Sequence, residues 1–278
     1  MNLNATSNIV SHAASVLAEV DGAIGTITLN RPQQRNALDI ALASELLDAL
    51  QSVLGRHTVR CVLLQAAGES FGVGGDIGLL ADETQAVPAA RHLLTILHEV
   101  VRVIRQSDRP VVCAVQGAVA GGSLSLALAC DVGVWASNAK LVPAYAKLGA
   151  SPDCGLSWTL ARALGPQRAL EWLLDGSALT ATQAQALGLL RHIVEPDMLP
   201  AYSRAMAEHM SALSPGAVAN TTRLIAQSLR STLDEQLDGE LVSFLQCVAT
   251  EPFRVNVHAL AAALKQSRNG VDSAPVSA

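Results

Sequence analysis

Hydrophobic periods along the chain predict strands that alternate with helices in its first half. Residues 16–20 and 24–29 alternate apolar and polar positions on either side of Asp21-Gly22, which predicts a β-hairpin. An amphipathic segment follows Asp39, a residue type that caps helix N-termini. The further predicted elements are helices at 39–54, 89–105 and 124–129 and strands at 59–65, 111–115 and 132–136. This alternation predicts an α/β core.

The second half of the chain is predicted to be almost entirely helical. Helical spacing recurs at 158–164, 168–174, 181–187, 202–212, 215–228, 232–249 and 257–264, with one short strand at 191–194. We therefore expect a flexible lead-in at 1–15, a core at 16–200, a helical region at 201–268 and a disordered tail at 269–278.

One uncharged stretch, residues 110–130, is long enough to resemble a membrane span, for which about 18 apolar residues suffice. Its first part is rich in β-branched residues, and Gly117, Gly121 and Gly122 interrupt any single helical period. We interpret it instead as a buried strand, a glycine turn and a buried helix, and we expect no contact with a membrane.

Charge and cysteine content exclude several classes of protein. The 19 Lys and Arg against 24 Asp and Glu give a net charge of -5 without a basic run, so nucleic acid is not an expected partner. The five cysteines are widely spread and include no CxxC pair, which argues against a disulfide framework and a structural zinc site. The first basic residue is Arg31, so no charged region of a secretory signal precedes it. We expect a soluble protein of the reducing cytoplasm.

Two glycine clusters are the strongest candidates for a site. The first is Phe71-Gly72-Val73-Gly74-Gly75-Asp76, and the second spans 117–122 between a predicted strand and a predicted helix. The first cluster lacks the Lys-Ser/Thr ending of a phosphate-binding P-loop and the spacing of a dinucleotide fingerprint. Glycine lets backbone N–H groups approach a ligand closely, and two such groups that converge on one oxygen form an oxyanion hole.

These clusters belong to a longer series of motifs. In chain order the motifs are Leu29-Asn30-Arg31-Pro32, Asn36-Ala37-Leu38, the 71–76 loop, Pro110-Val111-Val112, Gly117-Ala118-Val119-Ala120-Gly121-Gly122, Ala129-Cys130-Asp131, Gly149-Ala150-Ser151-Pro152-Asp153 and residues 184–189. In order and spacing they resemble the crotonase (enoyl-CoA hydratase/isomerase) superfamily over most of the chain. The resemblance weakens in the last helices, where Pro252, Val255 and Asn256 replace more usual residues.

The resemblance implies a crotonase-like spiral of ββα units with a C-terminal helical trimerisation region. It also implies a coenzyme A thioester substrate whose carbonyl oxygen lies between the backbone amides of Val73 and Gly122. Arg35 matches a basic position that commonly contacts coenzyme A phosphates. The alternative is that Arg35 is only a charged surface residue exposed to water. The other implied substrate contacts are Ala37, Gly74, Asp76, His98, Ser125 and Tyr145. No cofactor is implied beyond the coenzyme A of the substrate, and no metal.

The chain departs from the hydratase pattern at the two positions where hydratases carry glutamates. Those residues activate water and handle the proton at the α carbon. Ser125 and Tyr145 stand there instead, and their hydroxyls are poor acids and bases near neutral pH. The pattern therefore speaks against hydration by the paired-glutamate route.

Asp153 lies eight residues after Tyr145 and matches a catalytic aspartate of several relatives. These are dienoyl-CoA isomerases, ring-oxepin isomerases of phenylacetate breakdown and 4-chlorobenzoyl-CoA dehalogenase, where it is a nucleophile. The alternative is that Asp153 only caps a helix that begins near Gly155. We favour catalysis by Asp153, whereas neighbouring Cys154 has no adjacent base and is given no role.

The preferred interpretation is an isomerase of an unsaturated or ring-containing acyl-CoA, with Asp153 as the acid and base. The alternatives are a hydratase with atypical residues, a dehalogenase-like hydrolase and a non-catalytic acyl-CoA-binding subunit. His98 is spaced from Pro110 like the basic histidine of the dehalogenase, but a histidine on such a helix is more often a packed or surface residue.

We expect a homotrimer or a dimer of trimers, because the helices after residue 201 carry much apolar surface, including Leu229, Leu233, Leu237, Leu241 and Phe244.

Overall fold

The computed structural model describes residues 14–82 and 84–271, which form two compact units divided between Ala212 and Leu213. The expected boundary at residue 201 falls inside helix α8 (Leu199–Ala212). This helix packs against the strands of the main sheet, so the first unit continues to Ala212. Residues 1–13 of the expected lead-in lie outside the described residues.

The strands of the first unit form two sheets. The strands are β1 (Val16–Asp21), β2 (Ile24–Leu29), β3 (Cys61–Ala66), β4 (Val111–Val115), β5 (Ala118–Ala120), β6 (Val132–Ala136), β7 (Lys140–Val142), β8 (Leu179–Thr180) and β9 (His192–Val194). The main sheet has the order β1-β2-β3-β4-β6-β9, in which β1 and β2 pair antiparallel and all other neighbours pair parallel. The smaller sheet has the order β5-β7-β8.

Helices connect these strands. In the first unit they are α1 (Ile40–Leu54), α2 (Ile77–Leu80), α3 (Ala86–Arg105), α4 (Gly121–Ala129), α5 (Leu156–Leu164), α6 (Pro166–Asp175), α7 (Ala181–Ala186) and α8, with 3₁₀ turns at Pro32–Gln34, Ala146–Leu148 and Pro196–Met198. The described residues therefore confirm the expected α/β core, with strands and helices in alternation.

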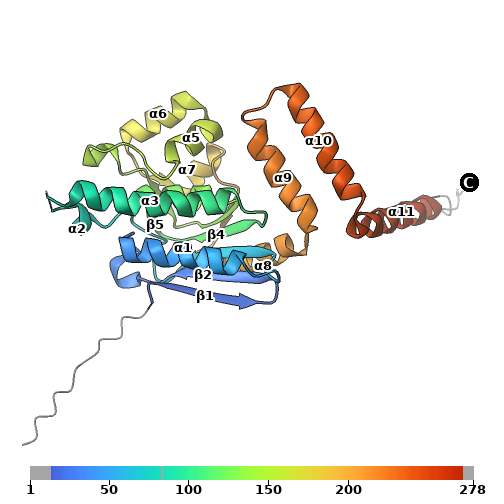
Figure 1. Ribbon diagram of the computed structural model, residues 1–278, viewed down its shortest axis with the longest axis horizontal. Coiled ribbons are helices and arrows are strands. Elements are labelled where there is room, and N and C mark those ends of the chain that lie inside the picture. Colours follow the sequence, from blue (N-terminus) through green and yellow to red (C-terminus); the bar gives the residue numbers. More distant parts are fainter. Residues whose placement is uncertain (1–13, 83, 272–278) are drawn as a thin grey trace, which may run out of the picture. The chain divides into compact units, whose positions relative to one another are not determined.

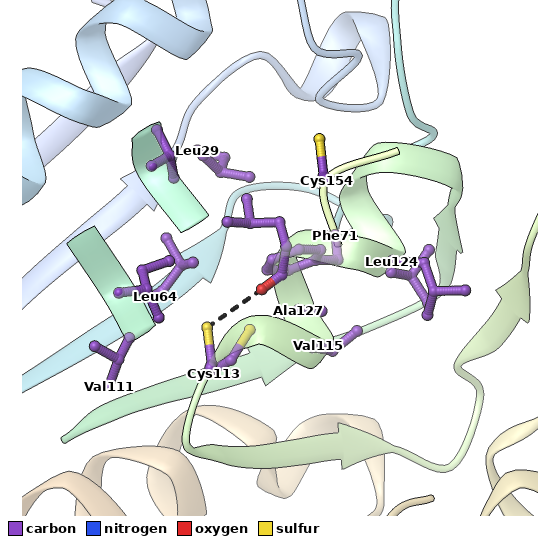
Figure 2. Packing of buried hydrophobic residues seen from close by; sticks show 14 of the residues in the cluster. Leu29, Leu64, Phe71, Val111, Cys113, Val115, Leu124, Ala127 and Cys154 are labelled. Atoms are coloured by element: carbon purple, nitrogen blue, oxygen red, sulfur yellow. Dashed lines mark hydrogen bonds between the residues drawn. The ribbon is translucent and has the colours of Figure 1, made fainter. Parts of the chain in front are cut away.

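Both faces of the main sheet are covered. Successive residues of a strand point to opposite faces, so one strand can contribute side chains to two hydrophobic clusters. On β3, Val62 and Leu64 join the larger hydrophobic cluster, which also contains residues of α1, α3, α4 and α5. Cys61 and Leu63 join a second cluster with Leu199 and other residues of α8. Figure 1 shows α1 and α3 running side by side along the sheet, and Figure 2 shows Leu64 and Val111 within the larger cluster.

Local signals placed most of these elements correctly. The Asp39 carboxylate accepts a hydrogen bond from Leu42 N at 2.8 Å and caps α1 as predicted. The uncharged stretch 110–130 holds strands β4 and β5 and helix α4, and no helix among the described residues is long and apolar enough to cross a membrane. Strand β3 begins at Cys61, two residues later than the pattern indicates.

The smaller sheet was not predicted. Its strands are two or three residues long, and Ala118–Ala120 lies inside the segment that we expected to be a glycine turn. Strands this short show no hydrophobic alternation, so pairing with distant partners alone defines them. This sheet holds the second glycine cluster in an extended form up to the start of α4.

The second unit consists of α9 (Pro215–Ser228), α10 (Leu233–Val248) and α11 (Glu251–Val271). Helix α10 begins with a capping box in which Thr232 and Glu235 each bind the other's backbone N–H. Helix α11 continues beyond the predicted end at residue 264 and includes 269–271 of the expected tail, while 272–278 lie outside the described residues.

Candidate active site

The two glycine clusters are held side by side by hydrogen bonds between distant parts of the chain. Gly72 N donates to Ala118 O at 3.2 Å, and Ala120 N donates back to Gly72 O at 3.0 Å. Gly74 N donates to the buried hydroxyl of Ser123 at 3.1 Å, which joins the first loop to the first turn of α4. The two glycine clusters are therefore adjacent in the fold.

Close approach explains why glycine stands at Gly74. Its φ of +89° lies in a region that residues with a Cβ rarely adopt, and an added Cβ would lie 3.1 Å from Ala120 O. The backbone of the first loop thus rests directly on the backbone that leads into α4.

Two residues at this junction line a cavity and have backbone N–H groups without a partner among the described residues. Val73 and Gly122 both line it, and within residues 14–82 and 84–271 neither N–H donates a hydrogen bond to the protein. Gly122 lies in the first turn of α4, where N–H groups have no partner inside the helix and the helix dipole favours negative charge. The pair can therefore stabilise an oxygen that becomes negatively charged.

Asp153 lines the same cavity and is held by two hydroxyl side chains. Tyr145 OH donates to Asp153 Oδ1 at 2.6 Å, and Ser125 Oγ lies 3.2 Å from Tyr145 OH. Ser125 Oγ also donates to the backbone oxygen of Asp153 at 3.2 Å. Tyr145 therefore binds the Asp153 carboxylate, and Ser125 binds both the Tyr145 hydroxyl and the Asp153 backbone.

The helix-cap alternative for Asp153 is wrong. Helix α5 begins at Leu156 with Gly155 at its N-cap, and no side chain of the described residues caps it. The carboxylate accepts the Tyr145 hydroxyl instead, since the turn at 154–155 carries it away from the helix start. Both Cys154 and Gly155 have positive φ there, at 48° and 78°.

Burial decides the protonation of the groups beside Asp153. Burial, reinforced by the Asp153 charge, raises the pKa of Tyr145 far above its ordinary value, so its phenol stays protonated and donates. Burial and the same charge also raise the pKa of the Cys154 thiol, which argues against a thiolate nucleophile. The buried Cys154 side chain instead belongs to the larger hydrophobic cluster, which also contains Phe71 and Leu124 (Figure 2).

The carboxylate and the second N–H donor lie close together. A Cβ added to Gly122 would lie 3.6 Å from Asp153 Oδ1 and 3.3 Å from Leu38 Cδ1. A side chain at Gly122 would therefore fill the space between the carboxylate and the backbone donor. Glycine at this position leaves that space unfilled.

The cavity has a volume of about 660 Å³ and a wall that is mostly apolar. Ile77, Leu80 and Leu94 line it from the α2 and α3 region, and Leu148 lines it from the loop before Asp153. His98 also lines it, as do Gly74 and Tyr145. A cavity of this size and composition suits an apolar acyl group.

Four predicted site residues lie outside this lining. Arg35 is exposed in a left-handed conformation with a φ of 49°, and the Ala37 carbonyl accepts a hydrogen bond from Arg31 Nη1 at 3.2 Å. Asp76 caps α2 by accepting from Gly78 N at 2.9 Å. Ser125 lies behind Tyr145 rather than on the wall.

Sequence reasoning missed Ser123, the residue whose hydroxyl joins the two glycine clusters. The available signal was a serine directly before a predicted buried helix, where a hydroxyl needs a partner. Among the described residues, no group of three or more His, Cys, Asp or Glu side chains is placed to hold a metal ion.

A second cavity, of about 580 Å³, is lined by few side chains that could act in catalysis. Gln65, Gln116 and Asn138 line it, and Glu69 is the only ionisable side chain on its wall among the described residues. Its described wall therefore offers no pair of ionisable side chains for acid and base chemistry.

Known proteins are similar to this chain in both sequence and fold. A family model described as Enoyl-CoA hydratase/isomerase matches residues 19–267. An Escherichia coli (strain K12) protein named 1,2-epoxyphenylacetyl-CoA isomerase is 34% identical over 227 residues, which cover 81% of this chain and 87% of the relative. The crystal structure of an enoyl-CoA hydratase from Polaromonas sp. JS666 has a TM-score of 0.84 at 32% identity, with 89% of this chain and 96% of the other covered. A Thermobifida fusca YX structure in complex with CoA has a TM-score of 0.78 at 27% identity, with coverages of 85% and 93%.

The chain therefore belongs to the enoyl-CoA hydratase/isomerase family, and it is an acyl-CoA enzyme of that family. The crotonase-like fold class expected from its motifs is confirmed by these structures.

Proposed function

We propose that the enzyme isomerises an unsaturated or ring-containing acyl-CoA by moving a proton between two carbons. The observation that carries this proposal is the Asp153 carboxylate, held by Tyr145 beside Gly122. Among the described residues that line the cavity it is the only carboxylate. One base beside two free N–H donors suits a reaction that removes and returns the same proton.

In the proposed reaction the thioester oxygen accepts hydrogen bonds from Val73 N and Gly122 N. The Asp153 carboxylate removes a proton from a carbon in conjugation with the thioester, and the electron pair moves to the thioester oxygen as a dienolate. The carboxylic acid then returns the proton two carbons away, which shifts the double bond and restores the carboxylate. Atoms and charge balance without a cofactor or metal, and Arg35 is assigned to the coenzyme A phosphates.

Hydration is the less favoured chemistry because it needs a group that activates water and another that protonates carbon. The raised pKa of Tyr145 keeps its proton on the phenol, and that proton is already donated to Asp153. Neither Tyr145 nor Ser125 therefore supplies the second base. The name of the Escherichia coli relative, an isomerase of an epoxide-bearing phenylacetyl-CoA, supports an isomerase here, while the Polaromonas structure is described as a hydratase.

Exchange of α protons with solvent tests the proposal. In D₂O, wild-type protein is expected to incorporate deuterium at the α carbon of a saturated acyl-CoA, because Asp153 removes that proton and the N–H pair holds the enolate. Mass spectrometry of the recovered thioester measures it, and the free acid serves as the control that is not expected to exchange. Tight binding of the thioester with no deuterium uptake would indicate a binding subunit and contradict the proposal.

A dehalogenase-like hydrolase is the second candidate, because His98 and Asp153 line the same cavity. In that reaction Asp153 attacks an aryl carbon, a halide leaves, and a base activates water against the aryl ester. His98 lacks the carboxylate partner that usually orients such a base, since nearby Glu99 pairs with Arg102 at 3.0 Å. We therefore rank this function below isomerisation.

Free thiols support a reducing compartment, and hence the cytoplasm, as the site of action. All five cysteines are free, and Cys247 is the one of the five that is not buried. Buried thiols of this kind do not need an oxidising compartment for folding.

The second unit supports assembly into a trimer or a dimer of trimers. Its helices expose Leu233, Leu241 and Phe244 at 72%, 59% and 62%, together with Leu237, and Leu229 is exposed at the C-cap of α9. Monomers rarely expose so many large apolar side chains close together on a few helices. Light scattering is expected to give a mass three or six times the 28.9 kDa of one chain, and a monomer at micromolar concentration would contradict the proposal.

A further inference from the structure

His98 is a polar side chain on a largely apolar wall. It lies on α3, one helical turn after Leu94, and both residues line the cavity that contains Asp153. The rest of the wall from this direction consists of Ile77, Leu80 and Ala90. The imidazole is half-buried.

The imidazole has no partner among the residues that the structure describes. Across the parts of the chain that the structure describes, no hydrogen bond, ion pair or ring contact involves His98. A histidine ring always offers at least one N–H donor, and the neutral ring also offers an acceptor. An alkyl chain packed against this ring would leave those groups without water and without a partner, which is unfavourable.

The same lack of partners argues against a role as a base. A catalytic imidazole is usually oriented by a carboxylate or carbonyl that binds its second nitrogen. His98 has no such contact among the described residues, so its available chemistry is hydrogen bonding to whatever occupies the cavity.

We infer that His98 is a specificity-determining residue that donates a hydrogen bond to an oxygen on the acyl group, away from the thioester. The preferred substrates are then acyl-CoA thioesters whose chain or ring bears an ether, epoxide, hydroxyl or keto oxygen, rather than plain alkyl chains. This inference rests on the proposed function only in placing the acyl group in the Asp153 cavity.

The inferred hydrogen bond can be tested with ligands that differ by a single ring atom. Cyclohexylacetyl-CoA is compared with its three ring-ether analogues, in which an oxygen replaces a CH₂ next to, one atom from or opposite the attachment carbon. Calorimetry measures the dissociation constants for wild-type protein and for His98→Leu, His98→Phe and His98→Gln. The matched control is His92→Leu, because His92 is on the same helix but is exposed and does not line the cavity.

For at least one ring ether, the ratio of its dissociation constant to that of the carbocycle is expected to rise about tenfold in His98→Leu and His98→Phe. His98→Gln, which retains an N–H donor, is expected to keep most of the wild-type ratio, and His92→Leu all of it. Ratios that are the same in wild type and in both apolar variants for all three ethers would overturn the inference. Deuterium exchange on the same ligands separates the two proposals: a His98-dependent ratio without exchange contradicts the isomerase chemistry and supports the His98 contact.

Discussion

Replacing Asp153 with asparagine is expected to lower turnover about 10³-fold or more, which corresponds to about 4 kcal/mol of transition-state stabilisation. The amide has the size of the carboxylate, and its oxygen can still accept the Tyr145 hydroxyl, which lies 2.6 Å from Asp153 Oδ1. It cannot take a proton from carbon. Affinity for the thioester, measured by calorimetry, is expected to change little, because Val73 N and Gly122 N are untouched.

Tyr145→Phe and Ser125→Ala are the matched controls for this variant. Tyr145→Phe removes the hydrogen bond that positions the carboxylate but leaves the base, so we expect a loss of about tenfold in turnover. Ser125 Oγ contacts the Tyr145 hydroxyl and not the Asp153 carboxylate, so Ser125→Ala is expected to cause a smaller loss of turnover. An active Asp153→Asn enzyme together with inactive hydroxyl variants would refute the single-carboxylate mechanism and favour an unusual hydratase.

His98→Gln distinguishes the isomerase from the dehalogenase-like hydrolase. An isomerase with one base is expected to tolerate this change on substrates that carry no extra oxygen, whereas the hydrolase needs a second base to release its aryl ester. Intact-protein mass spectrometry after incubation with a halogenated aryl-CoA is the measurement. An adduct that accumulates on Asp153 only in His98→Gln would reverse our ranking.

Gly117→Ala is expected to lower the free energy of unfolding by about 3 kcal/mol or more, through strain and overpacking together. An added Cβ would lie 1.9 Å from the backbone oxygen of Glu69, and backbone cannot rotate aside as a side chain can. The position also has a φ of +57°. Urea unfolding measures the loss.

Gly22→Ala is the matched control, since Gly22 has the same φ of +57° but nothing within 4 Å of an added Cβ. We expect about 1–2 kcal/mol there, from the backbone conformation alone. Equal losses in the two variants would show that the segment at Glu69 moves aside freely. A larger loss at Gly117, accompanied by weaker thioester binding, would link this contact to the position of the glycine cluster that leads to Gly122.

Much of the candidate site was predictable from residue types, and its contacts were not. The sequence placed Val73, Gly122 and Asp153 in one site through the motifs that resemble the superfamily. It left the cap role of Asp153 open, and the structure excludes that role because Gly155 is the N-cap of α5 and no side chain among the described residues caps this helix. The link from Gly74 to Ser123 spans 49 residues, and no local pattern predicts which hydroxyl a loop will meet.

The sequence by itself determined the elements whose signals lie within a few residues of one another. The Asp21-Gly22 hairpin, the Asp39 cap and the helical periods are such signals, because turn chemistry, capping and side-chain periodicity act over a turn or two of chain. Tertiary structure alone decided the smaller sheet and the contact that holds the catalytic candidate. Ser125, Tyr145 and Asp153 meet because α4 and the 145–153 loop pack together, and such contacts between distant segments depend on the whole core rather than on neighbours in sequence.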